Sequence, residues 1–371
     1  MIQYQDFQRR YPHAPQQILD ILSGQVRQGD FILKQNVQDF ELALADEVGA
    51  KHAVCVSSAT SAMTLSLIAA GIGPGDEVIT PAFCYVSAAS AIVRAGATPV
   101  FVDVQPSTCM LDAQAVAEAV TAKTRAVLVA HLFSGVADID AIRNALPDRV
   151  LLLEDSATAF GARLRGRSCG ALGDVGVYSF FPAKPLGGLG DGGAVVTNDD
   201  QLAHTVRMLR NHGQDGKRRF YHQLLGMNSR MDEVNAAWLL CQLPDNARQL
   251  ARKQAIARRY DQAIEASGLV FAGQERGSAD FSPHAYVLRS TQREQLSHHL
   301  SARSIQTKVH FPVPLPAQPA FAAWSQGSGS YPVAAMLARQ CLALPLCPGM
   351  HDKQVSHVVT ALEAFSHAHA V

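Results

Sequence analysis

Lys184 has the surroundings expected of a reactive amine. It lies in the segment GVYSFFPAKPLGGLGDGGAVVTN, between two apolar runs that predict strands, and five glycines follow it by residue 193. Such closely spaced glycines indicate a backbone that turns tightly or approaches another group. In a partly dehydrated loop the pKa of a lysine falls, so its neutral amine can attack a carbonyl carbon. A nucleotide-phosphate loop would need GxxxxGK[ST], or a GxGxxG that opens a helix, and this segment has neither.

Asp155 is the second candidate, because it ends the apolar run VLLLED at residues 150–155. An acid at the carboxyl end of a parallel strand lies at the edge of the sheet where ligands bind. Glu154 precedes it and should face the other side of the sheet, because strand side chains alternate. A helix cap or a salt bridge would account for Asp155 equally well from the sequence alone.

Hydroxyl side chains crowd a third position, the strand-to-helix junction CVSSATSAM. Ser57, Ser58, Thr60 and Ser61 lie at the first turn of the predicted helix, where free N–H groups and the positive end of the helix dipole favour an anion. Simple N-capping explains the same residues, since serine and threonine are favoured caps. Both interpretations stay open for this junction.

Thr60, Asp155 and Lys184 together supply what pyridoxal phosphate (PLP) chemistry requires. That chemistry needs an amine for the cofactor aldehyde, a carboxylate that keeps the pyridine nitrogen protonated, and a cradle for the phosphate. None of the three residues alone is specific for PLP chemistry, but their combination in this order along the chain is specific for it. The sequence therefore predicts a PLP site built on these residues.

Helices and strands alternate from about residue 36, and these elements must position the three candidates. The segment NVQDFELALADEVG predicts an amphipathic helix with apolar residues at Val37, Phe40, Leu42 and Val48. Short apolar runs such as AVCVSS, TPVFVDV and RAVLVAHL predict strands between such helices. Repeated units of this kind indicate an α/β fold with a mostly parallel sheet covered on both faces.

The pattern of predicted helices and strands changes after about residue 245. A long charged helix, ARQLARKQAIARRYDQAIEASG, leads there into a shorter region of mixed strands and helices and the Pro-rich stretch HFPVPLPAQPAF. We therefore expect a large PLP-binding α/β domain with an N-terminal arm at residues 1–247, and a smaller C-terminal α+β domain at residues 248–371. Ligands usually bind in the cleft between two such domains.

Composition restricts the partners and the compartment. Hydrophobic residues make up 48% of the 371 residues, and 32 basic residues balance 32 acidic ones, so nothing indicates binding to nucleic acid or to an anionic membrane. Seven scattered cysteines without a CxxC pair favour reduced thiols, and no histidine motif indicates a metal site. Without a signal peptide or a membrane-length apolar run, we expect a cytoplasmic protein.

The sequence resembles the DegT/StrS family of PLP-dependent nucleotide-sugar aminotransferases from about residue 28 to residue 365. The most specific stretches are GIGPGDEVITPAF, ATPVFVDV, EDSATAFGARLRGR, LGDVGVYSFFPAKPLGGLGDGGAVVTN, LGMNSRMDEVNAAWLL and VHFPVPLPAQPAF. The resemblance implies the aspartate aminotransferase (type I) fold, PLP as cofactor, and a homodimer whose active sites lie at the subunit interface.

The resemblance also implies a role for each matching residue. Lys184 would carry the cofactor as a Schiff base and shuttle a proton, Asp155 would pair with the pyridinium nitrogen, and Tyr85 would stack on the ring. The remaining matches would hold the phosphate, Asn228 from the partner subunit: Ala59, Thr60, Ser61, Ser179 and Asn228. A place in the core for Tyr85 and a hydrogen bond within its own strand for Ser179 are open alternatives.

Some positions depart from the family pattern. The family usually reads SSGT where this chain has Ala59 before Thr60, and Thr158 and Phe160 stand where it usually has Gln and often has His. A threonine is shorter than a glutamine, so we expect Thr158 to contact the cofactor only weakly. The space left beside the ring would then serve the substrate sugar or be filled by Phe160.

The implied activity is transfer of an amino group from an amino acid, expected to be L-glutamate, to a keto group of a nucleotide-linked sugar. The glycine-rich run after Lys184 and the HFPVPLPAQPAF segment favour amination at C3, with C4 as the alternative. Sugar dehydratases of the same fold carry His in place of the lysine, so Lys184 argues against them. A non-catalytic homologue is disfavoured because Lys184 and Asp155 are both present, and a nicotinamide oxidoreductase because the glycines follow the wrong strand.

Overall fold

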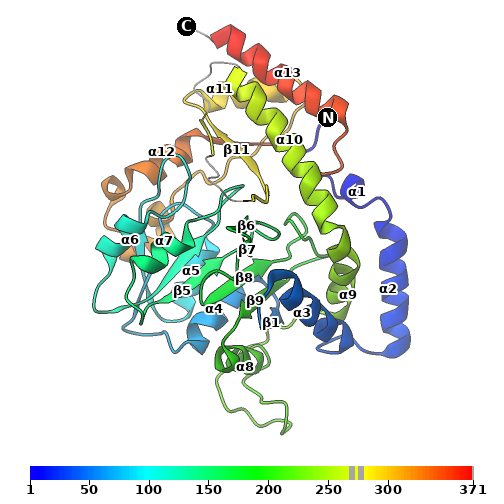
Figure 1. Cartoon of the computed structure of the whole chain (residues 1–371), viewed down its shortest axis with the longest axis vertical. Helices are drawn as coiled ribbons and strands as arrows, with labels where there is room; N and C mark the ends of the chain where they lie inside the picture. The colour runs from blue at the N-terminus through cyan, green and yellow to red at the C-terminus, as the bar shows by residue number, and fades with distance from the viewer. Residues whose placement is uncertain (267–271, 275–279, 370–371) are drawn as a thin grey trace.

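A seven-stranded sheet forms the centre of the computed structural model, which describes residues 1–266, 272–274 and 280–369 (Figure 1). Its strands are β1 (His52–Val56), β2 (Glu77–Pro81), β3 (Thr98–Val102), β4 (Thr124–Ala130), β5 (Leu151–Asp155), β8 (Val175–Ser179) and β9 (Gly193–Thr197). Their order across the sheet is β1-β9-β8-β5-β4-β2-β3. β9 runs antiparallel to both of its neighbours, while the other described strands of this sheet share one direction.

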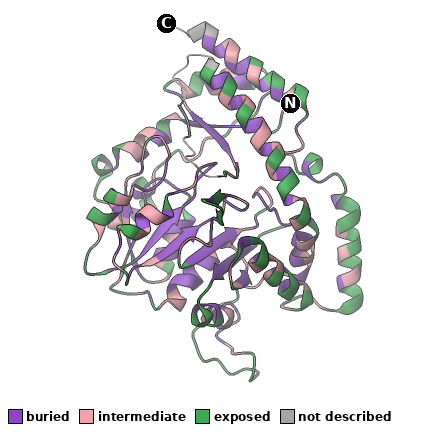
Figure 2. Ribbon diagram, viewed as in Figure 1, coloured by how far each residue is buried: buried purple, intermediate pink, exposed green. Residues whose placement is uncertain are grey.

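Helices cover both faces of this sheet, because its strands carry apolar side chains on both faces. In β1, Val54 and Val56 pack into the core that includes α4 (Ala59–Ala69), whereas Ala53 and Cys55 pack into the core that includes α3 (Gln35–Val48) and α9 (Glu233–Gln242). The strands are accordingly buried almost throughout, and α2 (Ala14–Gln28) is largely exposed (Figure 2).

A second apolar core lies in the C-terminal part of the chain, between α10 (Asn246–Ala266) and α13 (Asp352–His369). A small antiparallel sheet supports it, in the order β10 (Ala272–Gly273), β11 (Tyr286–Arg289) and β12 (Cys341–Leu344). Ile2 also belongs to this core, and its N–H donates to the Ser304 carbonyl at 2.7 Å. The N-terminus therefore lies beside α10 and α13, as Figure 1 shows, although the domain prediction placed residues 1–247 together. The boundary at 247/248 stays a prediction.

The remaining elements are short or connect these layers. The helices are α1 (Phe7–Arg10), α5 (Ser87–Arg94), α6 (Ala113–Ala119), α7 (Ile139–Asn144), α8 (Asp200–Leu209), α11 (Arg293–Ala302) and α12 (Pro332–Gln340). Short 3-10 helices span Leu243–Asp245, Leu315–Ala317, Pro319–Trp324 and Ser328–Ser330, and β6 (Arg163–Leu164) pairs with β7 (Arg167–Ser168).

The predicted α/β fold with a mostly parallel sheet is confirmed. One expected core residue is wrong: Leu42 is 71% exposed, and Leu44 is buried in its place. Val37, Phe40, Leu44 and Val48 follow the three- and four-residue steps of one helix face, whereas Leu42 falls on the opposite face.

The described residues contain neither a membrane-spanning helix nor a cluster of metal-binding side chains. No helix among them is long and apolar enough to cross a membrane. The same residues contain no group of three or more His, Cys, Asp or Glu side chains that could hold a metal ion.

Candidate active site

Several predicted site residues lie at the carboxyl edge of the parallel strands. Val56 at the end of β1 pairs with Gly193 at the start of β9, and Gly193 pairs in turn with Ser179 at the end of β8. Asp155 at the end of β5 lies between Ala130 of β4 and Val177 of β8. Loops that follow these strands therefore converge on one region, which is where an open α/β sheet binds its ligand.

Asp155 is a buried carboxylate with spare capacity to accept hydrogen bonds. It is 7% exposed, and its Oδ1 accepts from the N–H of Ala157 at 3.1 Å. Among the described residues none donates a hydrogen bond to Oδ2. Burial raises the pKa of Asp155, and the Ala157 N–H and the charge of Lys184 oppose that rise. A cationic N–H group in front of Asp155 would satisfy this carboxylate.

Glu154 faces the other side of the sheet, as strand alternation predicts, and its carboxylate is fully occupied. His131 Nε2 donates to it at 2.9 Å, and it accepts three backbone N–H groups, from Gly170, Leu172 and Gly173. His131 Nδ1 accepts from the Ala137 N–H at 3.1 Å, so we assign the proton of this ring to Nε2. Glu154 is thus a structural acid, and Asp155 is the acid that remains for chemistry.

The Lys184 amine lies close enough to Asp155 for each charge to act on the other. Burial lowers the pKa of Lys184 to about 8, against the opposing pull of Asp155. At pH 7 such an amine is neutral in roughly a tenth of the molecules, against fewer than about one in a thousand for an ordinary lysine. Lys184 therefore presents the nucleophilic form of its amine near neutral pH.

The junction after β1 contains a helix cap beside backbone N–H groups that the cap does not use. Ser58 caps α4, since its Oγ accepts the N–H of Ser61 at 3.1 Å. This cap leaves the N–H groups of Ala59 and Thr60 without an acceptor in the described part of the chain. Ser61 Oγ lies 3.2 Å from both Ser57 Oγ and Ser58 Oγ. The capping interpretation is therefore confirmed for Ser58, and the anion site at Ala59 and Thr60 stays a prediction.

Ser179 and Tyr85 have side chains free for a ligand. Ser179 Oγ, at the end of β8, takes part only in a long 3.4 Å contact with the Phe181 N–H among the described residues. Tyr85 is 58% exposed after β2, so the alternative that it belongs to the core is wrong. Its ring centroid lies 6.1 Å from that of Phe311. One face of the Tyr85 ring can therefore stack on a flat ligand.

The sequence reasoning missed an aromatic wall beside Tyr85. Phe311 packs against Phe83 at 5.7 Å and Phe133 at 6.0 Å between ring centroids. His310 adjoins this wall, and Tyr4 Oη lies 3.3 Å from its Nε2. The spacing within the stretch HFPVPLPAQPAF gives no sign that this stretch packs on residues some 180 to 230 positions earlier.

Thr158 and Phe160 have structural partners. Thr158 Oγ1 donates to the His131 carbonyl at 2.6 Å, which joins the loops after β4 and β5. Its hydrogen is therefore not available to a cofactor, and weak contact with the cofactor stays a prediction. Phe160 is buried against Tyr178 with a centroid distance of 5.4 Å, in the core on the α3 side of the sheet. Phe160 therefore does not fill space beside the site.

Asn228 lies outside the cluster formed by Lys184 and Asp155. Its side chain is exposed, at the base of a segment, residues 211–228, that extends from the body beyond α8 (Figure 1). The next residue, Ser229, is buried and its Oγ lies 3.0 Å from Ser57 Oγ. Asn228 is thus anchored near the α4 junction through its neighbour Ser229, while its own side chain is exposed.

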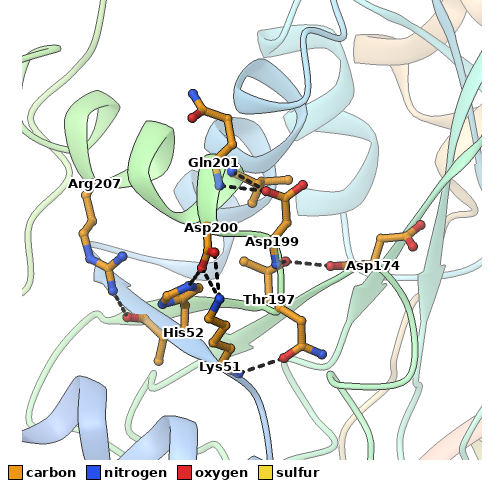
Figure 3. A network of polar contacts seen from close by, with 11 residues as sticks. Lys51, His52, Asp174, Thr197, Asp199, Asp200, Gln201 and Arg207 are labelled. Carbon is orange, nitrogen blue, oxygen red and sulfur yellow. Dashed lines mark hydrogen bonds and ion pairs between the residues drawn. The ribbon is translucent and has the colours of Figure 1, made fainter.

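A second polar network occupies the opposite edge of the sheet, where β1 begins and β9 ends (Figure 3). Asp200 accepts from Lys51 Nζ at 2.7 Å and lies 2.6 Å from His52 Nε2. Thr197 Oγ1 donates to the Asp174 carbonyl at 2.8 Å, and Asp199 caps α8. These side chains are paired with one another, and a nearby surface pocket is lined by residues of the same edge. We therefore assign this network to stability rather than to chemistry.

Known proteins resemble this chain over nearly its whole length. The model of the DegT/DnrJ/EryC1/StrS aminotransferase family matches residues 14–363. The UDP-2-acetamido-2-deoxy-3-oxo-D-glucuronate aminotransferase of Pseudomonas aeruginosa is 37% identical over 98% of this chain and 99% of its own length. The dTDP-3-amino-3,4,6-trideoxy-alpha-D-glucose transaminase of Streptomyces venezuelae is 40% identical over 91% of this chain and 89% of its own length.

One further related sequence and one solved structure are also similar to this chain. A protein of Geobacillus stearothermophilus described as a pleiotropic regulatory protein is 38% identical over 97% of both chains. Among solved structures, S. venezuelae DesV in complex with a ketimine intermediate superposes with a TM-score of 0.94, at 37% identity over 98% of both chains.

Proposed function

Because the chain belongs to the DegT/DnrJ/EryC1/StrS aminotransferase family, we propose that it uses PLP to move an amino group from an amino acid to a keto group of a nucleotide-linked sugar. The observation that carries this proposal is the meeting of Lys184 and Asp155 at the carboxyl edge of the sheet. The family and the transaminase class predicted from the sequence are confirmed by the comparisons.

The residues at this edge fit PLP. Asp155 has an unused carboxylate oxygen for the pyridine N–H, and Tyr85 has a free ring face. Ser179 Oγ and the open N–H groups of Ala59 and Thr60 would hold the phosphate. When bound, PLP supplies an electron sink for the carbon that gains or loses the amino group.

The protein supplies binding, charge and a proton carrier. The buried Asp155 attracts a cation strongly because the surrounding dielectric is low, so it keeps the pyridine nitrogen protonated. Lys184 would hold the cofactor aldehyde, and its amine of lowered pKa would carry the proton at the reacting carbon. The aromatic wall excludes water from one side of this region.

We propose C3 of the sugar as the position aminated. Two similar proteins carry names that specify a 3-oxo sugar substrate and a 3-amino sugar product. The glycine-rich run after Lys184 and the HFPVPLPAQPAF segment support the same position. C4 amination is the alternative outcome of the test below.

The test of this function is a panel of nucleotide-linked 3-keto and 4-keto sugars incubated with the PLP-loaded enzyme and L-glutamate labelled at its amino nitrogen. We expect mass spectrometry to find the label in the product of a 3-keto sugar. Label in 4-keto sugars alone would move the reaction to C4. Failure with every sugar, together with no conversion of glutamate to its keto acid, would contradict the enzymatic proposal and favour a regulatory role.

We also propose a homodimer in which Asn228 completes the active site of the partner subunit. Two groups of exposed apolar side chains support an interface between copies of this chain. The segment 211–228 carries Phe220, Tyr221 and Leu225, of which Leu225 is 97% exposed. Helix α2 exposes a stripe of Leu19, Leu22 and Val26, which share one helix face.

Mixing two inactive variants should restore activity if the sites are shared. In a heterodimer of Lys184→Ala and Asn228→Ala subunits, one site regains both Lys184 and Asn228, and the other lacks both. With random exchange of subunits in a two-fold dimer, about a quarter of all sites are intact. We therefore expect the mixture to recover up to about a quarter of the wild-type turnover.

Each variant mixed with itself serves as the control, and exchange is verified with a tagged subunit. If Asn228 serves the site of its own chain, every site of the heterodimer lacks one residue and no activity returns. That result, with exchange demonstrated, would contradict the shared site while leaving the aminotransferase assignment intact.

A further inference from the structure

Arg10 reaches from the N-terminal segment to the backbone around Lys184. Its Nη1 donates to the Lys184 carbonyl at 2.8 Å and to the Pro182 carbonyl at 3.4 Å, and its Nη2 donates to the Pro185 carbonyl. Its Nε donates to Gln249 Oε1 of α10 at 2.8 Å. Arg10 is only 7% exposed, and each of these bonds is buried or partly buried. One side chain thus contacts three carbonyls of the residue 182–185 segment.

This segment has few other ways to satisfy its carbonyl groups. Pro182 and Pro185 lack N–H groups, so the segment cannot fold into a regular ladder of backbone hydrogen bonds. Gly187 is packed so closely against the Pro182 carbonyl that a side chain there would collide with it. Buried carbonyls without donors are costly, so a donor group must be supplied from elsewhere.

Arginine is suited to this role because its planar guanidinium holds five N–H donors in a fixed fork. The short helix α1 that carries Arg10 is itself held on both sides. Tyr4 N–H, before it, donates to Gln306 Oε1 at 3.0 Å, and Tyr11, after it, packs edge-on against Trp238 at 5.2 Å between centroids. The Arg10 guanidinium is therefore held between the C-terminal core and the core that contains Trp238.

We propose that Arg10 is a positioning residue that holds the Lys184 segment so that the amine stays buried beside Asp155. This inference rests on the proposed function, because it gives Lys184 its part in the reaction. Arg10 acts through the backbone: burial and the charge of Asp155 account for the lowered pKa of Lys184, and Arg10 is not among its causes.

Other titratable groups near this segment would not account for a change in the titration of Lys184 near pH 8. His284 and His310 both have lowered pKa values because they are buried, that of His310 falling to about 4, so both are neutral near pH 8. Lys253 is buried near Arg10, and burial together with the charge of Arg10 lowers its pKa to about 7. A change in the titration of Lys184 near pH 8 therefore reports its own exposure to water.

The experiment measures the reactivity of the Lys184 amine in the chain freed of PLP. The wild type and the variants Arg10→Met and Arg10→Lys receive a short pulse of acetic anhydride at a series of pH values. Mass spectrometry then gives the acetylation of the Lys184 peptide. Arg9→Met is the matched control, because Arg9 bonds to Asp6 and Gln354 instead of the Lys184 segment.

We expect the midpoint for Lys184 to lie near pH 8 in the wild type and in Arg9→Met. In Arg10→Met it should rise by about one pH unit or more, as water reaches the amine. Arg10→Lys should give an intermediate midpoint, since an ammonium reaches fewer carbonyls than a guanidinium fork. An unchanged midpoint in Arg10→Met, or in Arg10→Lys if Arg10→Met does not fold, would overturn the role of Arg10.

Failure of the proposed function gives a different result. In that case the PLP-loaded wild type carries no pyridoxyl group on Lys184 after borohydride reduction, whatever the Arg10 variants show. Failure of the Arg10 inference alone leaves that group on Lys184 and leaves the midpoint where it was.

Discussion

Lys184→Ala should abolish turnover, with a fall of about 10⁴-fold or more, the upper range for loss of a proton-transfer group. The variant loses both the amine that holds the cofactor and the amine that moves the proton at the reacting carbon. Among the described residues no other lysine lies near Asp155 to replace it. Steady-state turnover of a nucleotide keto-sugar with L-glutamate measures the loss.

Lys51→Ala is the control, because Lys51 pairs with Asp200 at the opposite edge of the sheet (Figure 3). It should keep wild-type turnover. The folded state of Lys184→Ala should be at least as stable as that of the wild type, since a buried amine of lowered pKa is removed. Turnover within about tenfold of the wild type in Lys184→Ala would remove Lys184 from the chemistry.

Asp155→Asn should leave PLP bound but lower turnover by about 10²-fold or more. A neutral amide of the same shape cannot keep the pyridine nitrogen protonated, so the electron sink is weakened. Glu154 cannot substitute, because His131 and three backbone N–H groups already occupy its carboxylate. Rapid-mixing measurement of the half-reaction with L-glutamate isolates the affected step.

Although Asp155→Asn should lower turnover, it should not lower the stability of the folded chain without cofactor. The pKa of Asp155 is raised in the folded chain, so the folded state binds more protons than the unfolded state above the ordinary pKa. Stability contributed by this group is present at low pH and is lost as pH rises through the raised pKa. At neutral pH, Asp155→Asn should therefore melt no lower than the wild type. Asp200→Asn, at the opposite edge, should keep normal turnover, and a normal half-reaction in Asp155→Asn would contradict the role of Asp155.

The positions of Lys184 and Asp155 could be predicted because their signals are local. An acid that ends an apolar strand and a lysine that precedes a glycine-rich turn lie at a known edge of a parallel sheet. Alternation along one strand also separated Asp155 from Glu154 correctly. These predictions needed only the strand and its end, which the sequence defines within a few residues.

The remaining features depend on contacts between distant segments. Arg10 meets the Lys184 carbonyl across 174 positions, and Ile2 pairs with Ser304 in the C-terminal core. Nothing in the composition around Arg10 distinguishes it from Arg9, which bonds near the surface. Thr158 likewise gives its hydroxyl hydrogen to a carbonyl of the neighbouring strand end. Local patterns cannot show such partners, because they arise only when the layers pack.

The central claim, that Lys184 binds PLP covalently in a site built on Asp155, is tested most directly by chemical trapping. The PLP-loaded enzyme is reduced with borohydride, digested and mapped by mass spectrometry. We expect the pyridoxyl group on the peptide that contains Lys184, and no labelled peptide from Lys184→Ala under the same conditions. A pyridoxyl group on another lysine of the wild type, or on none, would contradict the claim.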